Sequence, residues 1–268
     1  MTPPDTWQRG WLGLLLTPAI VAMAALLLPH IHTGEQSASL IVFGGASATA
    51  LAALAVSATA YPLPVWRLAV AALSALIIGV LALAGVTSVA AAVAVDTVLV
   101  AAAWAVGTSI GRSIEHPGHL LPACVVVACA DAASMVSRFG PTRAIAESER
   151  ALSVLAIAFP VPGTASMAPA LGVGDLVFVA IVFGAVAAHG LSLPRAALLC
   201  FVGTSVAGAA SAALGTAVPA LLPIAAAVVL GIPEARKVRP RERRVASLAM
   251  VIAAMAAAAA IVAQLVAT

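Results

Sequence analysis

Hydrophobic residues fill long stretches of this chain, and polar residues gather in the connections between them. The longest apolar runs are close to the roughly 20 residues that a helix needs to cross the hydrocarbon core of a bilayer. Nine runs predict helices, at residues 11–28, 38–60, 65–86, 88–110, 120–137, 171–189, 194–214, 218–231 and 245–266. We therefore expect an all-α, polytopic membrane protein with about nine transmembrane helices.

The composition strengthens the membrane interpretation. The chain of 268 residues is 63% hydrophobic and 9% charged, with a mean hydropathy of +1.14. A soluble domain could not cover its surface with so few charges. The net charge of +3 does not indicate nucleic-acid binding, because the basic residues bunch in particular loops and form no basic, aromatic-interleaved face. The three cysteines lie in apolar segments without metal-ligand spacing, so we expect no metal site.

The distribution of basic residues predicts the orientation in the membrane. When the predicted segments cross alternately, one set of loops carries most of the Lys and Arg. That set holds Arg9, Arg67, Arg112, Arg195, Arg236, Lys237, Arg239, Arg241, Arg243 and Arg244, and the opposite set holds Arg138, Arg143 and Arg150. Because positive residues stay in the cytoplasm, we expect a cytoplasmic N-terminus and an external loop at 138–170.

Acidic residues inside the apolar segments are the candidates for chemistry. Three of the ten acids lie there: Asp96, Asp131 and Asp175. An ionised carboxylate in hydrocarbon is costly, so such a residue is a functional candidate and should have a partner. We expect Asp131 and Asp175, on adjacent predicted helices, to meet, share a proton and activate water for peptide hydrolysis. Asp96 lies on a separate segment without a motif and is interpreted as a structural or hydration-linked acid.

Two sequence motifs support this pairing. Gly172 and Gly174 precede Asp175 and remove side chains next to the acid, so that a neighbouring helix and an extended substrate can approach. Pro219 and Pro223 open the segment 218–231, where they withhold backbone donors and prevent a regular helical start. A broken backbone at membrane depth is tolerated only where it is buried in protein or lines a wet cavity. A catalytic water would need such a cavity.

The order of these features resembles the intramembrane aspartyl proteases of the presenilin and signal peptide peptidase family, which includes microbial homologues. The resemblance covers about residues 120–231. In chain order, these residues contain an apolar helix with one aspartate, a helix that opens with Gly-x-Gly-Asp, one more helix and then Pro-Ala-Leu. It implies a catalytic core at 120–231, preceded by transmembrane helices at 1–119 and followed at 232–268 by a basic cytoplasmic loop and an extra helix. It also implies a catalytic dyad of Asp131 and Asp175, and substrate-binding positions at Gly172, Val173, Gly174, Pro219, Ala220 and Leu221.

The resemblance further implies cleavage of single-span proteins or signal peptides within the bilayer. One aspartate would act as general base on a water and the other, protonated, would polarise the scissile carbonyl, without a metal or organic cofactor. The unwound substrate would pair in a strand-like way with the loop before Asp175 or with the turn at Pro219. An external loop between the aspartates matches the signal peptide peptidase orientation and predicts substrates with a cytoplasmic N-terminus. Neither the substrate's identity nor the oligomeric state follows from the sequence.

Departures from the family pattern leave alternatives open. Ala130 stands where the family usually has an aromatic residue, commonly tyrosine, and the segment after Val245 extends past the usual end of the family. One alternative is a proton-coupled transporter or channel that uses the three intramembrane acids. A second is a prepilin-peptidase-like enzyme, which also uses Gly-x-Gly-Asp. A third is a catalytically silent homologue that binds membrane helices.

Overall fold

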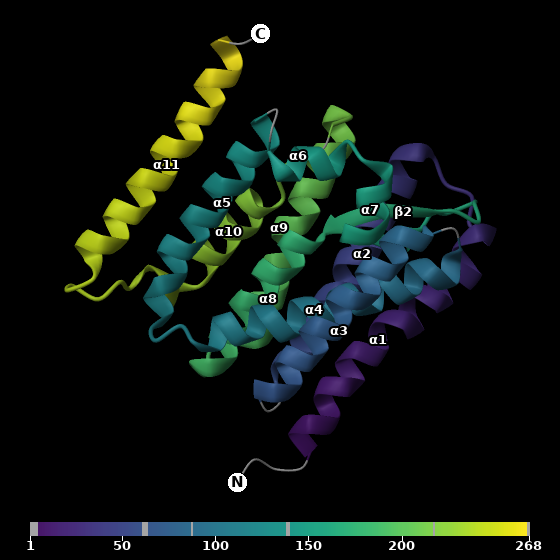
Figure 1. Cartoon of the computed structure of the whole chain (residues 1–268), viewed down its shortest axis with the longest axis horizontal. Helices are drawn as coiled ribbons and strands as arrows, with labels where there is room; N and C mark the ends of the chain where they lie inside the picture. Colours follow the sequence, from purple (N-terminus) through teal and green to yellow (C-terminus); the bar gives the residue numbers. More distant parts are fainter. Residues whose placement is uncertain (1–4, 61–63, 87, 138–139, 217, 267–268) are drawn as a thin grey trace.

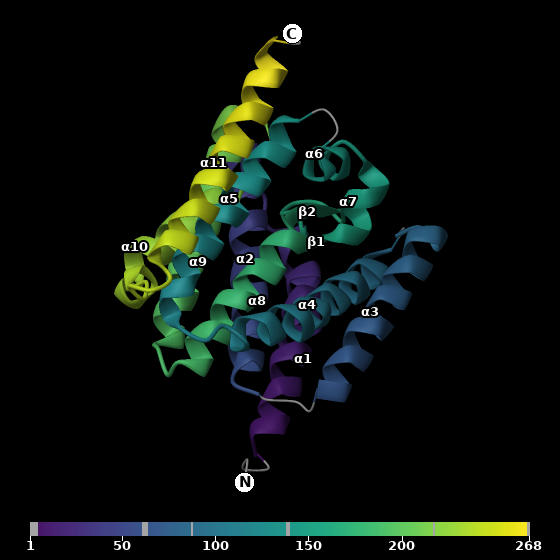
Figure 2. The same cartoon turned by 60° about the vertical axis from the view of Figure 1, so that its left-hand side comes forward.

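The computed structural model describes residues 5–60, 64–86, 88–137, 140–216 and 218–266, and it is mainly helical (Figures 1 and 2). The helices are α1 (Asp5–Leu27), α2 (Glu35–Ala58), α3 (Pro64–Ala84), α4 (Val89–Arg112), α5 (Leu120–Val136), α6 (Pro141–Ala146), α7 (Glu149–Leu155), α8 (Val173–Ala188), α9 (Leu193–Leu214), α10 (Leu221–Gly231) and α11 (Arg243–Val266). Short 3₁₀ helices lie at Leu28–His30, Pro117–His119 and Pro233–Arg236, and the strands are β1 (Ala156–Pro160) and β2 (Met167–Gly172).

Each of the nine predicted apolar segments forms a helix in the described part of the chain. Six of these helices, α1, α2, α4, α5, α9 and α11, are long and apolar enough to cross a membrane. The described part of α3 (Leu68–Ala84), α8 and α10 are shorter. The last two begin later than the hydrophobic pattern predicts, because β2 and the Pro219 turn occupy the residues before them. A mainly helical polytopic chain is therefore supported, with six helices that satisfy the length required for a span.

Helix boundaries follow local capping chemistry. Ser88, Ser148 and Ser192 precede α4, α7 and α9, and each hydroxyl accepts a hydrogen bond from the backbone N–H three residues later, at 3.2, 3.2 and 3.4 Å. These bonds satisfy donors that have no partner within the helix. Helix α9 ends at Gly215, whose φ of +64° is readily adopted by glycine.

A β-hairpin in the loop 138–170 is absent from the all-α prediction. Strands β1 and β2 pair antiparallel from Ala156 opposite Gly172 to Pro160 opposite Met167, with a register shift between Ile157 and Ala158. The loop predicted to be external forms α6, α7 and, together with the residues up to Gly172, this hairpin. Strand pairing satisfies the backbone groups of this segment, which packs next to apolar helices.

Helix α8 lies in the interior and packs along α4 through glycines. A Cβ added at Gly107 would lie 2.6 Å from the Val177 carbonyl oxygen, and one added at Gly184 would lie 2.8 Å from the Thr108 carbonyl oxygen. Small residues let helix backbones approach closely where lipid supplies no hydrophobic drive. The contact fixes α8, and therefore its first turn, against α4.

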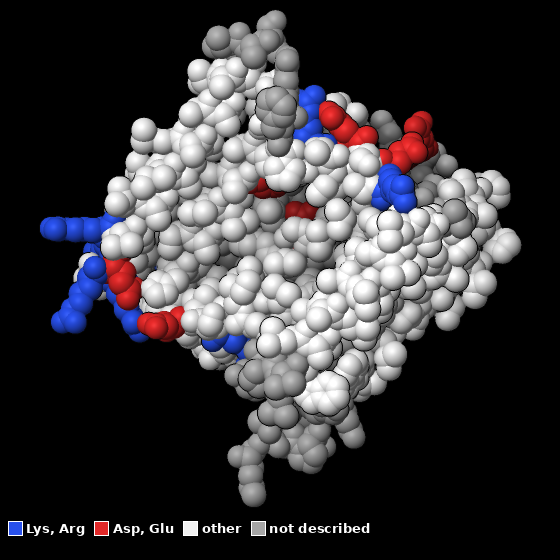
Figure 3. Space-filling view, viewed as in Figure 1, with Lys and Arg blue, Asp and Glu red and all other residues white. Residues whose placement is uncertain are grey.

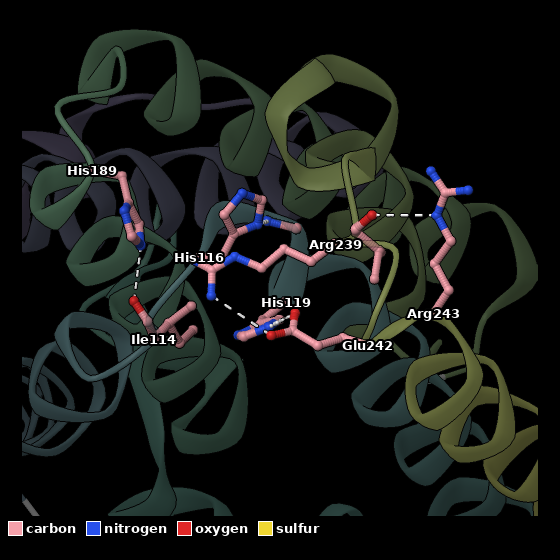
Figure 4. Close-up of polar contacts among 9 residues, drawn as sticks. Ile114, His116, His119, His189, Arg239, Glu242 and Arg243 are labelled. Atoms are coloured by element: carbon pink, nitrogen blue, oxygen red, sulfur yellow. Dashed lines mark hydrogen bonds and ion pairs between the residues drawn. The ribbon is translucent and has the colours of Figure 1, made fainter.

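The chain connections sort to two ends of the helical bundle. At one end, Arg112 donates to the Ala58 carbonyl at 2.7 Å, His189 Nε2 donates to the Ile114 carbonyl at 2.8 Å, and His119 Nε2 lies 2.6 Å from Glu242 Oε2. Figure 4 shows the last two contacts, with Arg239 beside Glu242. The connection after α2, both ends of the α4–α5 loop, the end of α8 and the start of α11 therefore meet here.

The opposite end joins the other set of connections. Arg150 of α7 donates to the Ala82 carbonyl at 2.6 and 2.9 Å, which caps the end of α3. The Gly163 N–H of the hairpin turn donates to the Leu28 carbonyl, at the end of α1, at 2.9 Å. Successive apolar helices thus start and finish at alternating ends, as in a chain that passes back and forth through a layer. Helix α11 lies at one edge of the bundle beside α5 (Figure 1).

Candidate active site

Asp175 lies in the first turn of α8, where the chain changes from strand to helix. Strand β2 ends at Gly172, which is the N-cap residue, and Asp175 is the third residue of the helix. Asp175 Oδ2 accepts a hydrogen bond from the Gly172 N–H at 3.2 Å. This is the return half of a capping box, and the helix N-terminus also stabilises negative charge through its dipole. The carboxyl group is therefore oriented by backbone on both sides of the junction.

Asp131 lies near the end of α5 and reaches the start of α10. Its Oδ2 accepts a hydrogen bond from the Leu221 N–H, the first residue of α10, at 3.3 Å. Residues 218–220 before it are not helical, which is consistent with the effect expected of Pro219. The interrupted backbone thus supplies a free donor, and a second helix N-terminus points at a second carboxyl group.

The two carboxyl groups meet at one pocket. A cavity of about 540 Å³ is lined by both Asp131 and Asp175, whose charges are close enough to interact. Each aspartate is partly buried and borders this cavity. Other polar side chains line the same cavity: Glu35, Ser39, Thr142, Thr204, Ser211 and Thr216. Acidic atoms are visible in a hollow near the middle of this face, in the region between α5 and β2, and the other charged side chains on the face lie towards its edges (Figure 3). Hydroxyl groups in such a cavity provide the partners that ordered water needs.

The predicted substrate-binding residues are brought together in part. Gly172, Pro219 and Ala220 line the cavity with the two aspartates. Leu221 is buried and contributes its N–H to Asp131 rather than a side chain to the cavity. Val173 packs against the hydrophobic core, and Gly174 is exposed. The predicted site is therefore assembled mainly around Gly172 and the Pro219 turn.

The glycines beside Asp175 are not required by the fold in the described residues. Gly172 has φ −72° and ψ 155°, which any residue adopts, and a Cβ there would lie 3.4 Å from Asp175 Oδ2. A Cβ at Gly174 would meet no described atom within 4 Å. Among the described residues no neighbouring helix approaches either glycine closely, and the approach of a substrate at these positions stays a prediction.

Chemistry at this site rests on the two carboxyl groups and the backbone donors around them. Among the described residues, no group of three His, Cys, Asp or Glu side chains could hold a metal ion. No protein-family model, curated protein or solved structure matches the chain. A pair of carboxyl groups that line one cavity, with one acid held at each of two helix N-termini, is suited to exchanging protons with a water bound between them.

Sequence reasoning missed the hairpin, which lines the cavity with Pro169, Ala170 and Leu171. The available signal was a short apolar run at 156–160 followed by prolines, which is typical of a strand of four to eight residues. It also missed the contact of Asp96, whose Oδ1 accepts a hydrogen bond from the Ala158 N–H of β1 at 2.8 Å. Sequence offers no signal for that contact, because the two residues lie on separate elements.

Proposed function

We propose that this protein is an intramembrane aspartyl protease of the presenilin and signal peptide peptidase type, with nine transmembrane helices. It would hydrolyse peptide bonds within the transmembrane segments of single-span proteins or within signal peptides. One observation carries the proposal: Asp131 and Asp175, on different helices, line one cavity, and each accepts a backbone hydrogen bond at the start of a short helix. The Pro219 turn, part of the family resemblance, supplies one of these bonds.

In the proposed reaction, one carboxylate removes a proton from a water as its oxygen attacks the scissile carbonyl carbon. The other carboxylic acid donates a hydrogen bond to the carbonyl oxygen and stabilises the tetrahedral intermediate. Proton transfer to the leaving nitrogen and collapse of the intermediate break the C–N bond and release an amine and a carboxylic acid. The aspartates exchange protons as a pair, so the two roles belong to the dyad.

Strand β2 supports the binding of an unwound substrate. A transmembrane helix hides its carbonyl groups in its own hydrogen bonds, so it must open before attack. Strand β2 lines the cavity along Pro169 to Gly172 and, in the described part of the chain, pairs with one strand, β1. Pairing of the opened segment with the other edge of β2 would satisfy backbone groups that lose their helical partners.

Charge at the two ends of the bundle supports the proposed orientation. Arg112 and the residues around Glu242 lie at one end, together with the basic run from Arg236 to Arg244, whereas Arg143 and Arg150 lie on the loop at the opposite end. Arg9, Arg67 and Arg138, also used for the orientation, have side chains outside the described residues. Under the positive-inside rule, the N-terminus is cytoplasmic and loop 138–170 is external. Substrates with a cytoplasmic N-terminus, which include type II proteins and signal peptides, then fit the site.

The rival functions account for fewer of these contacts. A transporter that relays protons through three acids needs Asp96 in the same path, whereas Asp96 is fully buried and bound to β1 outside the cavity. A prepilin-peptidase-like enzyme gives no reason for the bond between the Pro219 turn and Asp131. The protease proposal uses both the turn and the strand before Asp175.

Cleavage of a transmembrane reporter peptide in detergent tests the proposal. Wild type is expected to cleave it, and Asp131→Ala and Asp175→Ala are each expected to lose activity by at least about a hundredfold, since both acids act in proton transfer. Glu35→Gln is the matched control, because Glu35 is an acid lining the same cavity. A transition-state-mimicking inhibitor should block wild type. Undiminished cleavage by both Asp variants would show that the dyad assignment is wrong.

A further inference from the structure

Asp96 is a buried acid outside the cavity of the dyad. Its side chain comes from α4 and has 0% exposure. Oδ1 accepts the hydrogen bond from Ala158 at 2.8 Å, and Oδ2 has no hydrogen-bond partner among the described residues. Burying a carboxyl group with an unsatisfied oxygen costs stability. The chain therefore holds an unfavourable group at a position where leucine would pack without that cost.

The bond to Asp96 meets the hairpin at its irregular point. Ala158 follows the register shift between β1 and β2 and lies opposite Pro169. The Ala158 N–H donates to Asp96 and not to β2, so it lies on the outer edge of β1. Asp96 supplies the acceptor for this edge N–H, next to the point where the strand register shifts. A side chain of α4 thereby fixes the backbone of β1.

Helix α4 also fixes the element that follows the hairpin. Further along α4, the backbone of Gly107 lies close to the backbone of Val177 in α8. The backbone of Thr108 likewise lies close to that of Gly184. Strand β2 runs directly into α8, and the Gly172 N–H at this junction donates to Asp175. One helix therefore holds both sides of the junction that carries the second dyad acid.

We propose that Asp96 is a positioning residue for the dyad. By accepting the Ala158 N–H, it holds the hairpin against α4 and sets where β2 delivers Gly172 and Asp175. This inference rests on the proposed protease function, since positioning matters only when Asp175 reacts. Even a small displacement of a reacting group lowers the rate of the chemical step. The loss of Asp96 is therefore expected to change kcat more than KM.

Two substitutions separate the hydrogen bond from the bulk of the side chain. Asp96→Asn keeps the shape and the acceptor oxygen, whereas Asp96→Leu keeps the branching of the side chain, with somewhat larger volume, without an acceptor. Hydrogen–deuterium exchange of the segments 156–160 and 167–172 is expected to accelerate about tenfold or more in Asp96→Leu and to stay near wild type in Asp96→Asn. With the reporter peptide, kcat is expected to fall about tenfold in Asp96→Leu, and Asp96→Asn should restore it to within about threefold.

Thr97→Val is the matched control on the next position of α4. The Thr97 hydroxyl bonds only within its own helix in the described contacts, to the Val93 carbonyl at 2.8 Å. This variant is expected to leave hairpin exchange and kcat unchanged. Thermal unfolding of the variants distinguishes positioning from simple stability. Asp96→Leu removes an unsatisfied buried oxygen but leaves the Ala158 N–H without its acceptor, so it should unfold near the wild-type temperature while losing activity.

Each outcome decides one of the two proposals. Absence of reporter cleavage by wild type overturns the protease function whatever Asp96 does. Unchanged hairpin exchange in Asp96→Leu, or equal losses of kcat in Asp96→Leu and Asp96→Asn, overturns the positioning role. Should Asp96→Leu not fold, wild type still tests the inference, because the Ala158 amide must then exchange among the slowest of the hairpin, and fast exchange contradicts the bond.

Discussion

Two regions of this protein place carboxyl groups inside apolar helices. The carboxyl groups differ in their exposure and not in the number of backbone hydrogen bonds that they accept. Asp131, Asp175 and Asp96 each accept one backbone N–H, at 3.3, 3.2 and 2.8 Å. The first two are partly buried and line a cavity with several hydroxyl groups, whereas Asp96 has 0% exposure. An acid that water reaches can exchange protons, and a dry acid can only hold what it touches. This difference in exposure is why we propose that the two cavity acids react and that Asp96 positions the hairpin.

The largest expected effect comes from one chemical change made at both regions. Asp175→Asn keeps an oxygen that can accept the Gly172 N–H but cannot ionise, so we expect reporter cleavage to fall by at least about a thousandfold with little change in thermal stability. Asp96→Asn should retain activity to within about threefold, because its role is the acceptor alone. Measurement of kcat and of unfolding temperature for both variants checks the contrast. Equal loss in both variants would place Asp96 in the reaction and break the distinction.

A second pair of substitutions compares a glycine in each of the two regions, Gly107 and Gly174. Gly107 lies in the dry contact between α4 and α8, where a Cβ would approach the Val177 carbonyl oxygen to 2.6 Å. Gly107→Val is expected to destabilise the protein by about 1–3 kcal/mol through overpacking. Gly174→Val faces open space beside Asp175 and should change stability by less than about 0.5 kcal/mol. Denaturation in detergent measures both.

Reporter cleavage gives a second readout for Gly174, which is exposed next to Asp175. If the open space at Gly174 admits the substrate backbone, Gly174→Val lowers cleavage by about tenfold or more although the protein folds normally. Gly174→Ala, which adds a single methyl group and favours helix, serves as the smaller step. Full activity in both variants would show that the substrate does not pass this position.

The helices could be predicted from the sequence because they depend on uninterrupted apolar runs. The run 194–214 predicts α9 to within one residue, and the run 120–137 predicts α5 equally well. The β-hairpin could not be predicted from the sequence in the same way. Ala156–Pro160 is a short apolar stretch that periodicity does not separate from a helix fragment, and Pro169 argues against a strand until its partner is known. The strand conformation of 156–160 depends on its pairing with 167–172, which the sequence of either segment alone does not show.

The site was predictable where chemistry is local and not where it depends on packing. The Gly-x-Gly-Asp sequence predicts that Asp175 lies at a helix start, and the prolines around 219 predict a broken backbone, both of which the structure shows. That the Leu221 N–H reaches Asp131 is a matter of how α10 packs on α5. The partner of Asp96 is equally invisible in sequence, since Ala158 carries no distinctive side chain and offers only its backbone.

The smallest expected effect concerns an acid at the end of the bundle, outside the membrane-spanning segments. Glu242 lies 2.6 Å from His119 Nε2 and joins the start of α11 to the loop before α5 (Figure 4). The hydrogen bond from His119, with smaller contributions from nearby positive charge, holds the pKa of Glu242 below its usual value of 4.5. Glu242 is bonded to a partly exposed side chain, so it provides a reference for Asp131, Asp175 and Asp96, which accept hydrogen bonds from the backbone.

A carboxyl group whose pKa is lower in the folded protein stabilises it above the unfolded pKa, and that stabilisation disappears as the pH falls through the folded pKa. The contribution of Glu242 is therefore complete above about pH 4.5 and is lost below it. Thermal unfolding of wild type and Glu242→Gln between about pH 3 and 6 should show a small gap that closes at the acidic end. Glu147→Gln, which removes an exposed acid paired with Arg143 at the opposite end, controls for the loss of charge itself. A gap that widens on acidification would mean that the loop is not held by the ionised Glu242, because only the charged form gains from His119.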